Sequence, residues 1–263
     1  MTEPTPLFAQ LRTAIKAEEP VALATVIEGP HLGSKLLVTP LSVSGSLGDE
    51  DLDRVVARDV LGELAAGRTG IRRYGAQGQA RIDEVAVFIE SFAPPPQMLI
   101  FGAVDFTAAL AKVAKFLGYR VTVCDARPMF ATKKRFPFAD SVVVDWPNRL
   151  LDEVGAELGE RDAVAVLTHD AKFDIPAITS ALTTNVGYIG VMGSRRTHDD
   201  RTKRLVDAGV TKDELARLRS PIGIDLGGRT PEETAISIVA EIIALRTGRI
   251  VPALKETQGA IHR

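Results

Sequence analysis

The sequence predicts an α/β protein in which a small α+β domain precedes a larger domain built on a parallel sheet. From residue 97 onward, short apolar runs alternate with segments of helical periodicity across short links, a pattern typical of a parallel sheet with helices on both faces. Just before this point, the run Pro94, Pro95 and Pro96 cannot continue a sheet ladder and forms a stiff connector. We therefore place the domains at 1–93 and 97–250, the linker at 94–96 and a tail at 251–263.

The first domain is expected to contain two helices and four strands. One helix is predicted at 6–18. The other begins at Asp49, carries apolar residues at the helical period from Leu52 to Leu64, and ends near Gly67. Apolar runs predict strands at 21–27, 35–39, 70–74 and 84–92, and a glycine- and serine-rich stretch predicts a loop at 41–50.

The larger domain opens with a strand, a glycine turn, a helix and a second strand. The first apolar run, 98–101, ends at Gly102, and apolar residues at helical spacing follow from Phe106 to Leu117. The second strand, 121–124, ends at Asp125. Such a unit is Rossmann-like: a ligand lies over the amino terminus of the helix, and an acid after the second strand takes a ribose hydroxyl.

The glycine turn departs from the G-x-G-x-x-G pattern of dinucleotide-binding proteins. Val104 and Thr107 replace the glycines that let a pyrophosphate approach the backbone and let the helix pack closely on the strand. Asp105 adds a negative charge where a phosphate would lie. The sequence therefore predicts Rossmann topology with a turn poorly suited to an ordinary dinucleotide.

The rest of the domain continues the alternation. A Thr211–Glu214 capping box predicts a short helix, and Thr230 with Glu233 predicts the start of a long helix that ends near Gly248. In that helix we expect three residues to face the sheet, namely Ile236, Val239 and Ile243. Further strands are predicted at 141–145, 163–168 and 188–192, and further helices at 149–158, 176–182 and 197–208.

Composition narrows the function classes. A net charge of -2 with 25% charged residues gives no sign of a nucleic-acid or membrane surface. The sequence has no apolar run of membrane-spanning length, and its first residues lack the apolar segment of a signal peptide, so a cytoplasmic protein is expected. Cys124, the single cysteine, excludes an internal disulfide and a cysteine-cluster metal site, and no histidine pair has metal-ligand spacing.

Polar residues gather where the predicted strands end, which is where open α/β sheets bind their ligands. Gly193, Ser194, Arg195 and Arg196 open a helix, where free N–H groups and guanidinium groups suit a phosphate. A second glycine turn has similar chemistry, so a phosphorylated ligand is predicted. The candidate binding residues are Gly102, Ala103, Asp105, Asp125, Arg127, Thr168, His169, Gly193, Ser194, Arg195, Arg196, Gly227, Gly228 and Arg229.

Each candidate also has a structural interpretation. The arginines at a helix start can be solvated, and the glycine pair before the last helix can serve only a turn that needs positive φ. Asp125 can bind a ribose or pair with Arg127. His169 beside Asp170 is the candidate catalytic pair, although a histidine there is often a structural hydrogen-bonder.

Four sequence blocks stand out in the larger domain, namely DARPMFATKKRFPFAD, LTHDAKFDIPAI, GYIGVMGSRRTHDDR and SPIGIDLGGRTPEETAISIVAEI. Together they resemble the carboxyl-terminal domain of the XdhC/CoxI family, and the resemblance covers about 97–248. EPVALATVIEG and SVSGSLGDEDLDRVV extend the resemblance more weakly into the first domain. The family consists of accessory proteins of xanthine dehydrogenase and related molybdenum hydroxylases. The resemblance implies a homodimer that binds the molybdenum cofactor, assists its sulfuration with a cysteine desulfurase, and passes it to the apo-enzyme.

The chain departs from the family at both presumed sites. A glycine-cysteine pair is usual where this sequence has Gly45 and Ser46, and a second cysteine is usual where it reads GAQGQARIDE. The opening turn, usually G-A-G-H, has Val104 and Asp105 in its last two positions. Because a thiolate is the natural ligand or sulfur carrier in molybdenum chemistry, direct sulfuration by this chain is not expected.

Three functions therefore remain open from the sequence. The first is a maturation factor for a molybdenum hydroxylase, with the molybdenum cofactor or a nucleotide in the crevice. The second is an NAD(P)-dependent oxidoreductase, for which His169 is the candidate general acid or base. The third is an interaction scaffold with an empty crevice.

Overall fold

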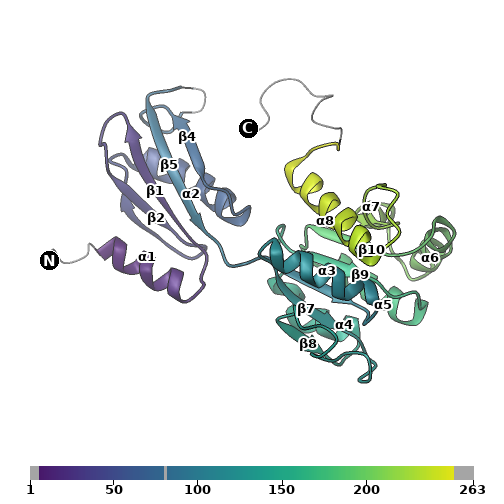
Figure 1. Ribbon diagram of the computed structural model, residues 1–263. Helices are drawn as coiled ribbons and strands as arrows, with labels where there is room; N and C mark the ends of the chain where they lie inside the picture. The colour runs from purple at the N-terminus through teal and green to yellow at the C-terminus, as the bar shows by residue number, and fades with distance from the viewer. Residues whose placement is uncertain (1–5, 80–81, 252–263) are drawn as a thin grey trace. The chain divides into compact units, whose positions relative to one another are not determined.

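The chain divides into two compact units on either side of the bond between Pro94 and Pro95. The computed structural model describes residues 6–79 and 82–251, and Figure 1 shows the elements of each unit. Each unit has its own sheet and its own hydrophobic core.

The first unit is an antiparallel five-stranded sheet with the order β3-β2-β1-β5-β4. The α2 residues Leu52, Val56 and Val60 share a core with alternate residues of β1, while Leu11 of α1 packs with the β1 residue Val21 from the other set. The elements are α1 (Pro6–Lys16), β1 (Val21–Glu28), β2 (Lys35–Val38), β3 (Val43–Ser46), α2 (Glu50–Ala65), β4 (Gly70–Tyr74) and β5 (Val85–Phe92).

The loop predicted at 41–50 was wrong in part, because it contains strand β3. Val43 pairs with Val38 and Ser46 pairs with Lys35 in an antiparallel ladder. The side chains of this edge strand are mostly exposed, so no apolar pattern marks it. Backbone pairing with the preceding strand β2 creates β3, and composition does not report such pairing.

The second unit is a parallel six-stranded sheet with the order β11-β10-β9-β6-β7-β8, which is the strand order of a Rossmann fold. The predicted fold class, a Rossmann-like parallel-sheet domain after a smaller α+β domain, is confirmed. The elements are β6 (Gln97–Phe101), α3 (Asp105–Phe116), β7 (Arg120–Cys124), β8 (Ser141–Val143), α4 (Pro147–Val154) followed by a short 3-10 turn (Gly155–Glu157), β9 (Ala163–Val166), α5 (Ala171–Leu182), β10 (Tyr188–Val191), α6 (Arg195–Asp207), α7 (Lys212–Ala216), β11 (Leu218–Arg219) and α8 (Pro231–Thr247).

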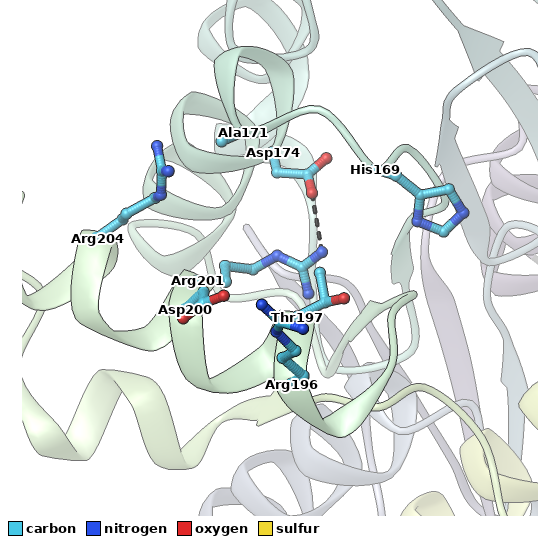
Figure 2. Close-up of a pocket in the computed structure, with 8 residues that line it drawn as sticks. All are labelled: His169, Ala171, Asp174, Arg196, Thr197, Asp200, Arg201 and Arg204. Carbon is cyan, nitrogen blue, oxygen red and sulfur yellow. Dashed lines mark hydrogen bonds and ion pairs between the residues drawn. The ribbon is translucent and has the colours of Figure 1, made fainter.

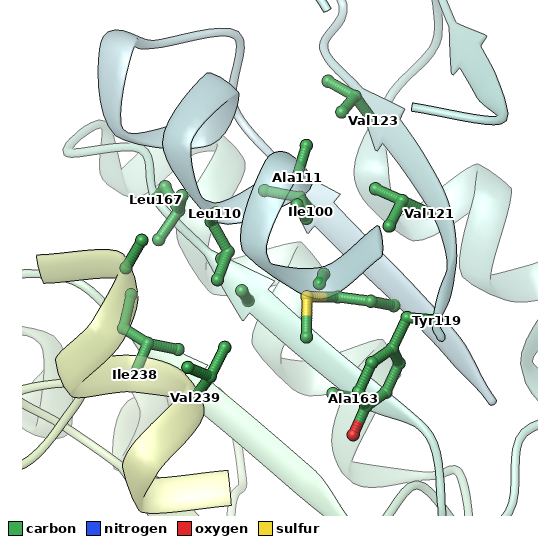
Figure 3. Close-up of a cluster of buried hydrophobic side chains, with 14 of the residues drawn as sticks. Ile100, Leu110, Ala111, Tyr119, Val121, Val123, Ala163, Leu167, Ile238 and Val239 are labelled. Carbon is green, nitrogen blue, oxygen red and sulfur yellow. The ribbon is translucent and has the colours of Figure 1, made fainter. Parts of the chain in front are cut away.

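Helices cover both faces of this sheet. On one face α3 and α8 lie side by side over Ile100 and Val121, as Figure 3 shows for Leu110 and Ile238. The other face, with Leu99 and Phe101 of β6, packs against α4 and α5. Cys124 is fully buried in this second cluster and is a residue of the core.

Two predictions for helices of this unit were wrong. In α8, Val239 is buried, but Ile236 and Ile243 are 50% and 39% exposed; Ala235, Ile238 and Ile242 face the core instead. The helix is apolar on most sides, so its periodicity does not identify the buried face. In α5, the helix begins at Ala171 and not at Pro176, because Asp170 accepts a hydrogen bond from the backbone N–H of Lys172 and caps it.

Candidate functional site

The neighbouring strands β6 and β9 each begin one half of the Rossmann sheet, and the strand order runs in opposite directions from them. The carboxyl ends of these two strands lie close together. Gly102, after β6, has a φ of +109°, and a Cβ placed there would lie 2.6 Å from Cγ2 of Thr168, after β9. Only glycine therefore fits this position without displacing Thr168. Ligands of open α/β sheets bind at such a divergence point.

The glycine turn before α3 is filled by the protein's own groups. Thr107 occupies the place of the third glycine, is fully buried, and donates its hydroxyl hydrogen to the carbonyl oxygen of Gly102. Arg135 donates to the carbonyl oxygen of Ala103 at 3.2 Å and lies 3.5 Å from the exposed carboxylate of Asp105. The turn thus keeps its geometry without the second and third glycines of the motif and presents an acid at the start of the helix.

Asp125 is committed to contacts within the protein. Its carboxylate accepts the backbone N–H of Ala103 at 2.7 Å and the backbone N–H of Arg127 at 2.9 Å. The guanidinium of Arg127 donates to both oxygens, at 2.9 and 2.8 Å. Burial alone would raise the pKa of Asp125, but the hydrogen bonds from Arg127 and Ala103 outweigh it and lower the pKa below its usual value. The carboxylate that would bind a ribose hydroxyl therefore ties the β7 end to the glycine turn.

The lowered pKa makes a pH-dependent contribution to stability. A carboxyl whose pKa is depressed by folding stabilises the folded state above its unfolded pKa, about 3.9, and loses that contribution as the pH falls through its lower folded pKa. We expect Asp125→Asn to cost stability at about pH 7 and the difference from the wild type to shrink below about pH 4. Denaturant unfolding of both proteins at a series of pH values measures this difference in the free energy of unfolding. A difference that stays constant down to about pH 2 would contradict the stabilising role of the Asp125 carboxylate.

A pocket of about 230 Å³ opens beside the carboxyl ends of β9 and β10. It is formed by the loop after β9, the first turn of α5 and one side of α6, and Figure 2 shows its lining residues: His169, Ala171, Asp174, Arg196, Thr197, Asp200, Arg201 and Arg204. Ser194 caps α6 by accepting the backbone N–H of Thr197 at 3.2 Å. The pocket therefore combines a helix amino terminus with three guanidinium groups, which suits an anion.

A buried ion pair forms one wall of the pocket. Nη2 of Arg201 donates to the Asp174 carboxylate at 2.9 Å, and the two side chains are 5% and 3% exposed. Arg201 also donates to the carbonyl oxygen of Met192 at 2.9 Å, while Asp174 accepts the hydroxyl of Thr168. Burial raises the pKa of Asp174, although Thr168 and Arg201 both act to lower it. The pair joins α5, α6 and the ends of β9 and β10.

The other two arginines of the pocket are exposed. Among the residues that the structure describes, neither Arg196 nor Arg204 forms an ion pair. Asp200, the second acid of the lining, lies 4.0 Å from Lys203. The exposed guanidinium groups are thus available to a ligand.

The structure brings part of the predicted site together in this pocket. His169 and Arg196 line it, and Thr168 and Ser194 support it through Asp174 and Thr197. Arg195 is exposed and outside the lining. Asp170 is the cap of α5, and its charge acts on Arg127.

The glycine turn before α8 is occupied by an acid of the helix. The backbone N–H groups of Arg229 and Thr230 both donate to the Glu233 carboxylate, at 2.6 and 3.0 Å, and the N–H of Gly227 donates to Asp225 at 3.3 Å. Gly227 has a φ of +68°, which glycine adopts readily. These contacts favour the structural interpretation of Gly227, Gly228 and Arg229.

Sequence reasoning missed Asp174, Arg201 and Arg204. Arg201 precedes the buried Leu205 by four residues, so it lies on the inward side of α6, and that spacing was the available signal. Helix α6 is so rich in charged residues that its sequence predicts a solvent-exposed helix.

No group of three or more His, Cys, Asp or Glu side chains that could hold a metal ion occurs within 6–79 and 82–251. None of the helices described for the chain is long and apolar enough to cross a membrane.

The fold and the pocket define a Rossmann-type domain whose arginine-lined pocket lies beside β10 and α6, away from the glycine turn. Residues 98–242 match the XdhC Rossmann domain, and residues 14–75 match the XdhC and CoxI family. The chain belongs to the XdhC/CoxI family.

Curated relatives resemble parts of the chain. A protein of Bacillus subtilis described as a probable xanthine dehydrogenase subunit is 36% identical over 160 residues, which is 61% of this chain and 46% of the relative. The molybdenum cofactor insertion chaperone PaoD of Escherichia coli is 26% identical over 159 residues, 60% of this chain and 43% of the relative. The chain spans less than half the length of these relatives.

A solved structure has the same fold. A crystal structure described as a xanthine dehydrogenase from Bacillus halodurans is 21% identical, with a TM-score of 0.55 over 93% of this chain and 96% of that one. At this identity the likeness supports the fold alone.

Proposed function

We propose that this chain is an accessory factor in the maturation of a xanthine dehydrogenase-type molybdenum hydroxylase, and that its Rossmann crevice holds a phosphate-bearing ligand, either the molybdenum cofactor or a nucleotide. Membership of the XdhC/CoxI family and the name of the PaoD relative support the accessory role. The observation that carries the ligand proposal is the pocket lined by Arg196, Arg201 and Arg204 at the amino terminus of α6.

The residues present fit the phosphate end of the molybdenum cofactor and not its metal end. Guanidinium groups and the Thr197 hydroxyl are donors that suit a phosphate. The chain's single cysteine is buried, and burial raises its pKa to about 12, so Cys124 is a poor thiolate ligand or sulfur carrier. We infer that the chain binds and presents its ligand, while a separate protein, such as a cysteine desulfurase, supplies sulfur.

The roles of the chain's own residues follow from their positions. Arg196 and Arg204 would attract the phosphate, and the capped start of α6 would orient it. His169, exposed at the rim, would hydrogen-bond the ligand. The engagement of Asp125 by Arg127 counts against a nicotinamide dinucleotide in the usual pose.

The partner in this proposal is the apo form of a molybdenum hydroxylase, which would receive the ligand in the cytoplasm from a homodimer of this chain. Native mass spectrometry of protein purified gently from its own host, with molybdenum analysis, tests the cargo. A mass increment with molybdenum identifies the molybdenum cofactor, and an increment without metal identifies a nucleotide. A bare polypeptide after gentle purification would count against a carrier.

Replacing Arg195 and Arg196 together by alanine is expected to abolish binding of the ligand without unfolding the chain. Both side chains are exposed at the start of α6, so their loss removes one charge from the pocket lining, one charge beside it, and little packing. Lys203→Ala with Lys212→Ala removes the same net charge from outside the pocket and serves as the control. Unchanged affinity of the arginine variant, or equal loss in the lysine control, would contradict the assignment.

A further inference from the structure

We propose that Asp174 sets how tightly the pocket binds an anion, by neutralising part of the charge of Arg201, so that the phosphate end of the ligand is held loosely enough to be handed on. This inference rests on the proposed function, because it concerns the pocket assigned there to a phosphate group. It identifies a residue that weakens binding inside a site otherwise built to strengthen it.

The two acids of the pocket are in different surroundings. The three arginines and two aspartates of the lining together carry a net charge of +1. Asp200 is 62% exposed, whereas Asp174 is 3% exposed. Water and salt screen an exposed charge far more than a buried one. Asp174 is therefore the acid that opposes a bound anion most strongly.

Arg201 is held in place but not saturated. Its Nη2 group uses both hydrogens, on Asp174 and on the carbonyl oxygen of Met192, and Nη1 lies 3.4 Å from the hydroxyl of Ser220. A guanidinium has five N–H donors, so two of them have no hydrogen-bond partner among the described residues. A Cβ at Gly193 would lie 3.4 Å from Nη1 and 3.2 Å from Cβ of Thr197, so Gly193 lies beside the guanidinium group.

Weakened anion binding suits a protein that must release its ligand. For one binding site, affinity differences arise mostly from the dissociation rate, so a tenfold gain in affinity slows release by about tenfold. An uncompensated buried arginine would hold a phosphate dianion strongly. Partial neutralisation keeps the positioned N–H donors of Arg201 while it lowers the net attraction.

Sulfate is the probe for the test, because it resembles a phosphate dianion and does not titrate near neutral pH. Its affinity for the full chain is measured by calorimetry at constant ionic strength. Asp174→Asn raises the pocket charge from +1 to +2 and is expected to tighten sulfate binding by at least about tenfold. The double variant Asp174→Asn with Arg201→Gln restores +1 and should return the affinity toward that of the wild type.

Asp200→Asn is the matched control, since it makes the same charge change at an exposed position; it should tighten binding by no more than about threefold. A purely structural role for Asp174 predicts that Asp174→Asn weakens binding. Equal or weaker sulfate binding by folded Asp174→Asn protein would overturn the proposal. If that variant does not fold, Asp174→Ser removes the same charge with a smaller side chain and is judged by the same criterion.

The experiment separates this inference from the proposed function. Loss of sulfate binding in the Arg195 and Arg196 double variant, together with no gain in Asp174→Asn, would keep the anion pocket and reject only the attenuation. If the sulfate affinity is unchanged both in the Arg195 and Arg196 double variant and in Asp174→Asn, the anion pocket itself is rejected.

Discussion

Replacing Arg201 with methionine is expected to destabilise the parallel-sheet unit by about 3–5 kcal/mol near neutral pH, because it leaves the Asp174 carboxylate buried without its cation. The substitution also removes the hydrogen bond to the carbonyl oxygen of Met192. Trp146, the only tryptophan of the chain, packs 4.7 Å from Phe173 between ring centroids, so its fluorescence reports on unfolding of this unit.

Arg204→Met is the control for this prediction. It makes the same substitution one turn further along α6 at an exposed residue without an ion pair in the described part of the chain, and should change stability by less than about 0.5 kcal/mol. Asp174→Asn combined with Arg201→Met removes both buried charges and should recover much of the loss. Equal unfolding midpoints for the two arginine variants would contradict a buried charge pair.

The loss of stability of the Arg201→Met protein relative to the wild type should depend on pH. Burial already raises the pKa of Asp174, and loss of the cation raises it further. A carboxyl with a raised folded pKa favours the folded state most below its unfolded pKa of about 3.9, and that contribution is lost as the pH rises through the folded pKa. The difference from the wild type should therefore be smaller at about pH 5 than at about pH 7.5.

Local sequence patterns were sufficient for most of the fold. The apolar run before Gly102, the helix after it and the strand that ends at Cys124 are each determined by neighbours in the chain, and all three occur in the structure. Strand β3 was missed because its pairing with β2 is its main support. In α8, the exposed Ile236 and Ile243 show that periodicity fails on a helix that is apolar on most sides.

The candidate site was only partly predictable, because some of its contacts join residues that are far apart in the sequence. Ser194 and Arg196 belong to a local motif at a helix start and were recognised. Arg201 and Asp174 are separated by 27 positions, and each alone reads as an ordinary charge on a helix. For Asp125 the sequence left two roles open, and the hydrogen bonds to Arg127 and Ala103 show the structural one.

The second large effect is expected for Gly102→Ala, which should lower the free energy of unfolding by about 3 kcal/mol. A φ of +109° strains any residue with a Cβ, by roughly 1–2 kcal/mol. The added Cβ would also lie 2.6 Å from Cγ2 of Thr168 and 3.2 Å from its backbone nitrogen, so one strand end must move, at about 1–3 kcal/mol. Because Thr168 donates to Asp174, that shift should also disturb the pocket and weaken sulfate binding.

Gly118→Ala separates backbone strain from crowding. Gly118 has a φ of +83° at the end of α3, and a Cβ there would have no heavy atom within 4 Å, so it should cost only about 1 kcal/mol and leave sulfate binding intact. Adding Thr168→Ser to Gly102→Ala removes the crowded methyl group but keeps the hydroxyl, and should recover part of the loss. If Gly102→Ala is no worse than Gly118→Ala, or Thr168→Ser brings no recovery, the close approach of β6 and β9 does not explain the glycine at 102. A positive coupling in this double-mutant cycle would show that the glycine is retained to bring the two strand ends together beside the arginine pocket.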